Sequence, residues 1–226
     1  MLAAAWLALN DLMTPALRAV LWKTLGLTLL LLVLVWLGLQ QLVLHFAVWP
    51  DRPWIETSVA IVSGLGFIVG LAFLVGPVSA LMAGLFSDDI ASVVEQTHYP
   101  LDPPGKGLSF GASLSGALGF TLTAILVNLV CLALLLVPGV NLVAFFVGNG
   151  YLLGREFFEA AAARFGGVEH ARALRRENGA LVLLGGFVIA LFLAVPIVNL
   201  LTPLFAMAFM THLNKRVTGR LSEGPV

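Results

Sequence analysis

Hydrophobic residues run along this chain in long unbroken stretches rather than alternating with polar ones. Lys, Arg, Asp and Glu are absent from residues 24–50, 57–87, 107–154 and 179–211. A helix that crosses a hydrocarbon core about 30 Å thick needs about 20 apolar residues. One small soluble domain lacks the polar surface to cover four such stretches. The pattern therefore predicts an all-α integral membrane protein.

Prolines and polar clusters divide this single membrane domain, residues 1–226, into two transmembrane helices and two helical hairpins. The arms of the second hairpin are short, because residues 197–211 rise only about 22 Å as a helix. This favours hemi-penetrating hairpins. The predicted elements are an interfacial helix at 1–14, spanning helices at 21–44 and 57–86, a cytoplasmic loop at 96–107, hairpin one at 108–165, a cytoplasmic basic segment at 166–178, hairpin two at 179–214 and a cytoplasmic tail at 215–226.

Two shorter segments have amphipathic helical patterns. In the first, Leu2, Trp6, Leu9 and Met13 share one face, which suits a helix lying in the membrane interface. The second follows Ser87. Helical spacing predicts an apolar face formed by Ile90, Val93 and Val94. The opposite face is acidic and contains Asp88, Asp89 and Glu95.

An internal repeat marks the two hairpin turns. Residues 134–147 read LLLVPGVNLVAFFV, and residues 192–205 read FLAVPIVNLLTPLF, with six identities at an offset of 58. In each copy an apolar helix meets a proline, Pro138 or Pro196, and restarts near an asparagine, Asn141 or Asn199. Asparagine is a strong helix N-cap. Helix N-termini at turns of this kind attract anions in some transporters. The simpler interpretation is that the asparagines only cap the helices.

The few charges in the chain bear on orientation and partners. Charged residues are 11% of the sequence and the formal net charge is zero, which gives no reason to expect nucleic-acid binding. If the N-terminus is cytoplasmic, Arg52 is the one basic residue on the outer side of the membrane. The other eleven basic residues then lie inside, as the positive-inside rule requires: Arg18, Lys23, Lys106, Arg155, Arg164, Arg172, Arg175, Arg176, Lys215, Arg216 and Arg220.

Signatures of enzymes and cofactors are absent from the sequence. The four histidines have no metal-ligand spacing, and no serine lies in a nucleophile elbow. No glycine-rich phosphate loop is present, and Cys131 lies in an apolar run. We therefore expect no catalytic residue, no metal and no cofactor.

Two basic regions are candidates for handling a solute. Leu17 and Arg18 precede the first span, where a cation beside free helix N–H groups favours an anion; a snorkelling lipid anchor is the alternative. The second region is a possible electropositive vestibule, whose alternatives are solvated ion pairs and a face that binds lipid headgroups. Its members are Arg155, Glu156, Arg172, Arg175 and Arg176, with Arg155 spaced to pair with Glu159.

Several segments together resemble the CysZ-like sulfate permeases and the wider etoposide-induced membrane-protein family. They are the Leu17-Arg18 element, FSDDIASVVE at 86–95, VPGVN at 137–141, GYLLGREFF at 150–158, VPIVNLLTP at 195–203 and MTH at 210–212. The resemblance implies two spans, two hemi-penetrating hairpins and a homo-oligomer that admits sulfate for cysteine biosynthesis. It also implies a sulfate site at a Gly-Leu-Arg-Arg element. Here Leu17 and Arg18 match, Ala16 and Ala19 replace its other residues, and Lys23 follows one turn later.

The function expected from these observations is an anion permease or channel-like uptake protein of the bacterial inner membrane, with sulfate as the leading substrate. Its substrate-binding residues would be Leu17, Arg18 and Lys23. The alternative is a non-transporting membrane scaffold of the same family that binds lipid or a protein partner.

Overall fold

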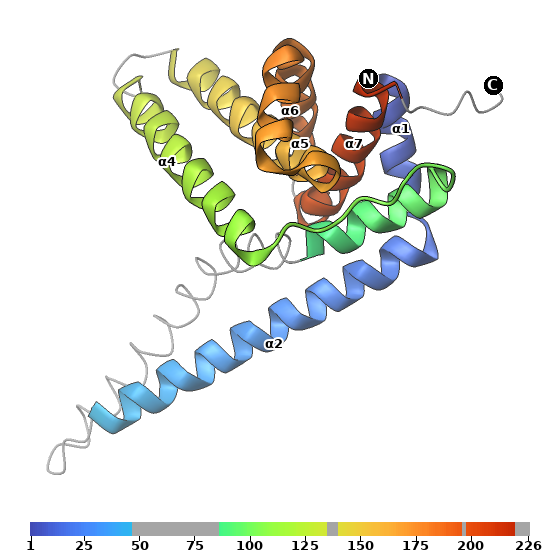
Figure 1. The fold of residues 1–226 in the computed structure, drawn as a ribbon. Coiled ribbons are helices and arrows are strands. Elements are labelled where there is room, and N and C mark those ends of the chain that lie inside the picture. The colour runs from blue at the N-terminus through green and yellow to red at the C-terminus, as the bar shows by residue number, and fades with distance from the viewer. Residues whose placement is uncertain (47–85, 135–139, 196–197, 220–226) are drawn as a thin grey trace, which may run out of the picture. The chain divides into compact units, whose positions relative to one another are not determined.

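The computed structural model describes residues 1–46, 86–134, 140–195 and 198–219. Within these ranges every regular element is helical, which confirms the all-α prediction (Figure 1). The elements are α1 (Leu2–Asp11), α2 (Pro15–Phe46), a helix at residues 86–98, α4 (Phe110–Leu134), α5 (Val140–Glu177), α6 (Gly179–Leu193), the 3₁₀ turn η1 (Val198–Leu201) and α7 (Thr202–Val217).

Contacts divide the chain into two units. One contains Met1–Arg18 and Ser87–Val226, and the other contains Ala19–Phe86. In the second unit the predicted span at 21–44 falls within α2. Pro15–Gly38 is the one helix among the described residues that is long and apolar enough by itself to cross a membrane. The predicted span at 57–86 lies outside the described residues except for Phe86.

Helix α7 forms the centre of the first unit. It contacts α1, α5 and α6, and it is buried on all sides from Leu204 to Lys215. Pro203 lies in its first turn, where the missing N–H of proline costs nothing. The rings of Phe192 and Phe205 stack at 4.3 Å between centroids, which joins the end of α6 to α7.

Helix α1 places its apolar side chains as the sequence predicts. Leu2, Trp6 and Leu9 are 87, 65 and 37% exposed, Met13 just after the helix is 62% exposed, and Ala4 and Ala8 on the opposite face are buried. The helix ends at Asp11. Thr14 then caps α2: its hydroxyl accepts a 3.4 Å hydrogen bond from the Leu17 N–H, and Pro15 begins the new helix. This exposed apolar face is what a helix at a lipid surface requires.

The hairpin arms are helices, and neither predicted asparagine lies at an N-cap. Helix α7 is preceded by η1 and its N-cap is Leu201, so Asn199 does not cap it. With the 3₁₀ turn before it, the N-cap of the α-helix lies two residues downstream of Asn199. Helix α5 begins at Val140, one residue before Asn141. Pro138 and Pro196, and the side chains of both asparagines, lie outside the described residues.

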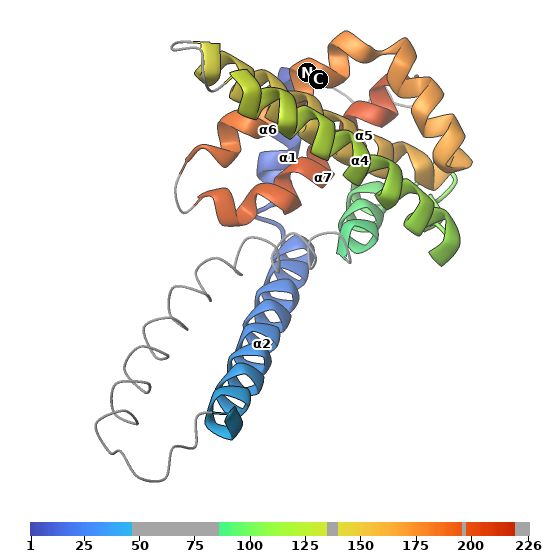
Figure 2. The ribbon, with the colours of Figure 1, turned by 90° about the vertical axis from the view of Figure 1, so that its left-hand side faces the viewer.

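The predicted basic segment at 166–178 is helical. It continues α5 beyond a break at Gly167, whose φ of +77° favours glycine. The pair Phe146–Glu177 and Gly179–Leu193 is bent by 95°, and it is a candidate for one broken span or for a re-entrant loop. Figure 2 shows the course of α5 and α6 from the side.

Glycines bring α5 and α6 into backbone contact. A Cβ built on Gly186 of α6 would lie 1.8 Å from the carbonyl oxygen of Gly150, and one on Gly154 would lie 2.5 Å from the Val182 carbonyl oxygen. Gly150 and Gly154 are four residues apart on one face of α5. Small residues at this spacing let membrane helices approach closely, where packing rather than hydrophobic burial drives association.

Substituting Gly186 with Ala is expected to destabilise the protein by about 1–3 kcal/mol, because the new methyl group must push the helices apart. Gly116→Ala is the matched control. A Cβ there meets nothing within 4 Å, so this variant should be neutral or slightly more stable. Reversible unfolding of the purified variants in mixed detergent and SDS micelles measures both. Equal unfolding midpoints would contradict the close contact.

Candidate functional site

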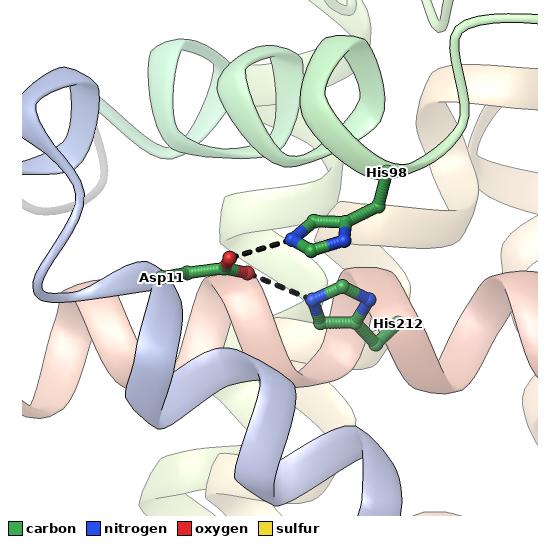
Figure 3. Close-up of side chains that lie close together, drawn as sticks. All are labelled: Asp11, His98 and His212. Carbon is green, nitrogen blue, oxygen red and sulfur yellow. Dashed lines mark hydrogen bonds and ion pairs between the residues drawn. The ribbon is translucent and has the colours of Figure 1, made fainter. Parts of the chain in front are cut away.

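Three side chains from distant parts of the chain meet in the first unit. Asp11 ends α1, His98 ends the helix at 86–98, and His212 lies on α7. The Nε2 atom of His98 is 2.6 Å from Asp11 Oδ1, and that of His212 is 2.8 Å from Oδ2 (Figure 3). The side chains of Asp11 and His212 are 5% and 0% exposed, and that of His98 is 28% exposed. One carboxylate thus joins three segments.

Tyr99 completes this cluster. Its hydroxyl lies 2.7 Å from Nδ1 of His212, on the side of the ring opposite Asp11. With Asp11 ionised, Nε2–H of His212 donates to the carboxylate and Nδ1 accepts from the Tyr99 hydroxyl. Burial alone would raise the pKa of Asp11, but hydrogen bonds from His212 and His98 outweigh it and hold the pKa below its usual range. Burial, with Asp11 and Asp102 nearby, raises the pKa of Tyr99 to about 12.

A buried lysine lies beside the cluster. Lys215 of α7 is 1% exposed, and its Nζ donates a 2.7 Å hydrogen bond to Asp102. The same ammonium group lies 5.4 Å from the centroid of the Tyr99 ring and 4.3 Å from that of Phe165. Because the carboxylate and two ring faces surround it, the charge is compensated where water is excluded.

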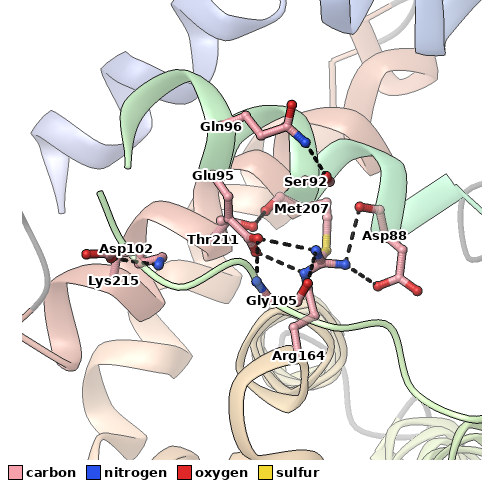
Figure 4. A network of polar contacts seen from close by, with 10 residues as sticks. All are labelled: Asp88, Ser92, Glu95, Gln96, Asp102, Gly105, Arg164, Met207, Thr211 and Lys215. Atoms are coloured by element: carbon pink, nitrogen blue, oxygen red, sulfur yellow. Dashed lines mark hydrogen bonds and ion pairs between the residues drawn. The ribbon is translucent and has the colours of Figure 1, made fainter. Parts of the chain in front are cut away.

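Arg164 of α5 is the centre of a second polar network, shown in Figure 4. Its Nε donates a 2.9 Å hydrogen bond to Glu95, and the guanidinium group also binds Asp88 and the Gly105 carbonyl oxygen. The Gly105 N–H donates to Glu95 at 3.0 Å, and the Lys106 N–H donates to the Arg164 carbonyl oxygen. The segment after the helix at 86–98, predicted as a polar loop, is therefore tied to α5. Glu95, predicted on the acidic face of this helix, is only 5% exposed, because Arg164 of α5 pairs with it.

The predicted anion-binding residues fall on both sides of the boundary between the two units, which lies between Arg18 and Ala19. Leu17 is buried, and the Arg18 side chain is exposed in the first turn of α2. The Leu17 N–H donates to the Thr14 hydroxyl and the Arg18 N–H donates to the Thr14 carbonyl oxygen, so both donors, which were expected to be free, are occupied. Lys23 belongs to the other unit, where its Nζ lies 4.7 Å from the centroid of the Phe86 ring.

Two of the predicted vestibule arginines share one carboxylate. Arg155 and Arg175 donate to the same oxygen of Glu159, at 3.3 and 2.6 Å. The predicted pair at four-residue spacing is confirmed, and the structure adds Arg175 across the break at Gly167. This three-residue group has a net charge of +1.

The remaining vestibule residues lie nearer to solvent. Arg172 pairs with Glu169 at 2.8 Å, and that glutamate is 86% exposed. Glu156 and Arg176 are exposed. An exposed ion pair such as Arg172–Glu169 contributes about 0–1 kcal/mol to the stability of the fold.

Sequence reasoning missed the residues of both buried networks. His98 and His212 are 114 positions apart, so no local spacing reveals them as a pair. One signal was available, because Asp11 is the one acidic residue before residue 51. A lone acid in an apolar helix needs a partner. His212 and Lys215 give the same kind of signal, because they are polar residues at the end of the apolar stretch that forms α7.

These features together define an all-α membrane protein. Its helices carry large exposed apolar side chains, and its few buried charges are paired. The chain belongs to the family described as sulfate transporter CysZ/etoposide-induced protein 2.4, whose model matches residues 4–203. The predicted resemblance is thereby confirmed. None of the curated proteins matches the chain.

Replacing Glu95 with Ala should destabilise the protein by about 3 kcal/mol or more, because Arg164 would keep a buried charge without its main partner. Glu169→Ala removes an exposed partner of Arg172 and should change stability by less than about 1 kcal/mol. Both values come from unfolding midpoints in detergent micelles. Equal loss of stability in both variants would contradict a stabilising role of the buried Arg164–Glu95 pair.

Proposed function

We propose that this protein is a permease or channel-like uptake protein for a small inorganic anion, with sulfate for cysteine biosynthesis as the leading substrate. The family match over residues 4–203 carries the proposal. The protein would lie in the bacterial inner membrane as a homo-oligomer, with both termini in the cytoplasm. The eleven-to-one distribution of basic residues supports this orientation.

In this proposal Arg18 binds the anion at the start of α2. Its side chain is exposed, and it takes part in no ion pair among the described residues. Leu17, the preceding residue, is buried. A guanidinium group fits the oxygens of a tetrahedral anion through parallel hydrogen bonds. Lys23 on the same helix would add positive charge along the route.

The group formed by Arg155, Glu159 and Arg175 would serve as an electropositive approach. One carboxylate shared by two guanidinium groups leaves an excess positive charge. Positive potential at a mouth raises the local concentration of anions. Because Glu159 already pairs with both arginines, neither of them is free to hold an arriving anion in a rigid ion pair.

Arg18→Ala should lower sulfate flux into proteoliposomes about tenfold or more, because a charge-assisted hydrogen bond contributes about 1.5–3 kcal/mol. Arg18→Lys keeps the charge and should retain part of the flux. Arg216→Ala removes an exposed arginine from the last turn of α7 and is the matched control. Labelled sulfate taken up by liposomes with equal protein content measures all four proteins.

Flux no greater than that of empty liposomes would refute transport of sulfate. Equal flux from the wild type and Arg18→Ala would refute the assigned site while leaving transport intact. The scaffold alternative predicts a different result: removing Arg172, Arg175 and Arg176 together would abolish binding to anionic lipid vesicles without any effect on solute uptake.

A further inference from the structure

We propose that Asp11, His98 and His212 form a binding site for a divalent transition-metal ion of the zinc type. This inference goes beyond anion transport and does not depend on it. The three side chains offer one carboxylate oxygen and two imidazole nitrogens, all within 4.8 Å of one another. Two histidines and one carboxylate are a ligand set that Zn²⁺ and similar ions use in proteins.

The directions of the ligand atoms support the proposal. Both Nε2 atoms face the same carboxylate, as Figure 3 shows, at 2.6 and 2.8 Å. A ring nitrogen that loses its proton keeps a lone pair in the direction of the former N–H bond. One divalent cation could therefore take the place of the two N–H hydrogens, with each neutral ring carrying its single proton on Nδ1 instead of Nε2.

Metal binding requires a rearrangement of the cluster, because the two short contacts go to different oxygens of Asp11 and the ligand atoms lie up to 4.8 Å apart. With bonds of about 2.0–2.2 Å in tetrahedral geometry, neighbouring ligand atoms lie about 3.3 Å apart. The two contacts must then lengthen by about half an ångström. His98 is at the end of its helix and 28% exposed, so it is the ligand with room to move, whereas Asp11 and His212 are held in the interior.

Tyr99 is positioned to act as the outer-shell partner of His212. Metal-binding histidines usually bond a second group through the other ring nitrogen, which fixes the tautomer and the ring orientation. The Tyr99 hydroxyl lies 2.7 Å from Nδ1 of His212. On metal binding Nδ1 carries the proton and donates it to the hydroxyl oxygen. Lys215, the cation next to Tyr99, is already neutralised by Asp102 at 2.7 Å.

The charge and the exposure of the cluster define the type of site. One carboxylate and two neutral imidazoles leave a bound divalent ion with a net charge of +1. The three protein ligands leave a fourth position, and the partly exposed side of His98 admits a water molecule or an anion to it. The ion would also tie α1, the helix at 86–98 and α7 together, and so stabilise the folded state.

The test uses the full-length protein in detergent, freed of its purification tag and stripped of metal with a chelator. Titration with Co²⁺ should give one ion per chain with the visible absorption of a tetrahedral site, and Zn²⁺ should displace it. Zn²⁺ should also raise the midpoint of thermal unfolding. His98→Ala, Asp11→Asn and His212→Ala should each weaken binding by at least roughly a hundredfold, and Tyr99→Phe by roughly tenfold.

His170→Ala is the matched control, because His170 is exposed and lies outside the cluster. It should bind Co²⁺ as the wild type does. His98→Ala removes the least buried ligand and keeps the test valid if the His212 variant fails to fold. Absence of saturable binding, or equal affinity in the wild type and His98→Ala, would overturn the proposal. Because sulfate flux is not measured, neither result bears on transport.

Discussion

Charges buried in an apolar chain must be compensated, and this requirement governs the first unit. Transfer of an ionised group out of water costs several kcal/mol unless an opposite charge and hydrogen bonds replace its hydration. Arg164, Lys215 and Asp11 are 6, 1 and 3% exposed, and each has such partners. The partners come from other segments, so pairing fixes which segments meet. Apolar contact alone carries much less directional information.

Sequence periodicity predicted those features that depend on a single helix. The exposed face of α1 and the Arg155–Glu159 pair follow from a repeat of 3.6 residues, and the structure shows both. The same rule failed for Glu95. A helix face with acidic residues is assigned to solvent by its pattern, yet Arg164 from another helix covers it. Local patterns do not reveal what lies across an interface.

The polar clusters were beyond prediction for the same reason. Asp11 and His212 are separated by 201 positions, and only the packing of α1 on α7 brings them together. The start of α7 shows a different limit. A repeated Pro-x-x-Asn motif predicted the same cap twice, but Thr202 and Pro203 follow the second copy and shift the helix start. In the first copy α5 begins at Val140, one residue before Asn141, so neither asparagine lies at the N-cap position.

The segment between the helix at 86–98 and α4 has a practical consequence for topology mapping. By composition it is the natural place to insert a reporter or a protease site, since it is rich in proline and glycine. However, Gly105 lies between Arg164 and Glu95, where an added Cβ would lie 3.0 Å from both side chains. An insertion there would separate Gly105 from Glu95 and from Arg164 of α5. If the reporter then indicated an inverted topology, the cause would be a damaged fold and not the native orientation. Leu101, at 94% exposure, is a position where a tag can report the native orientation.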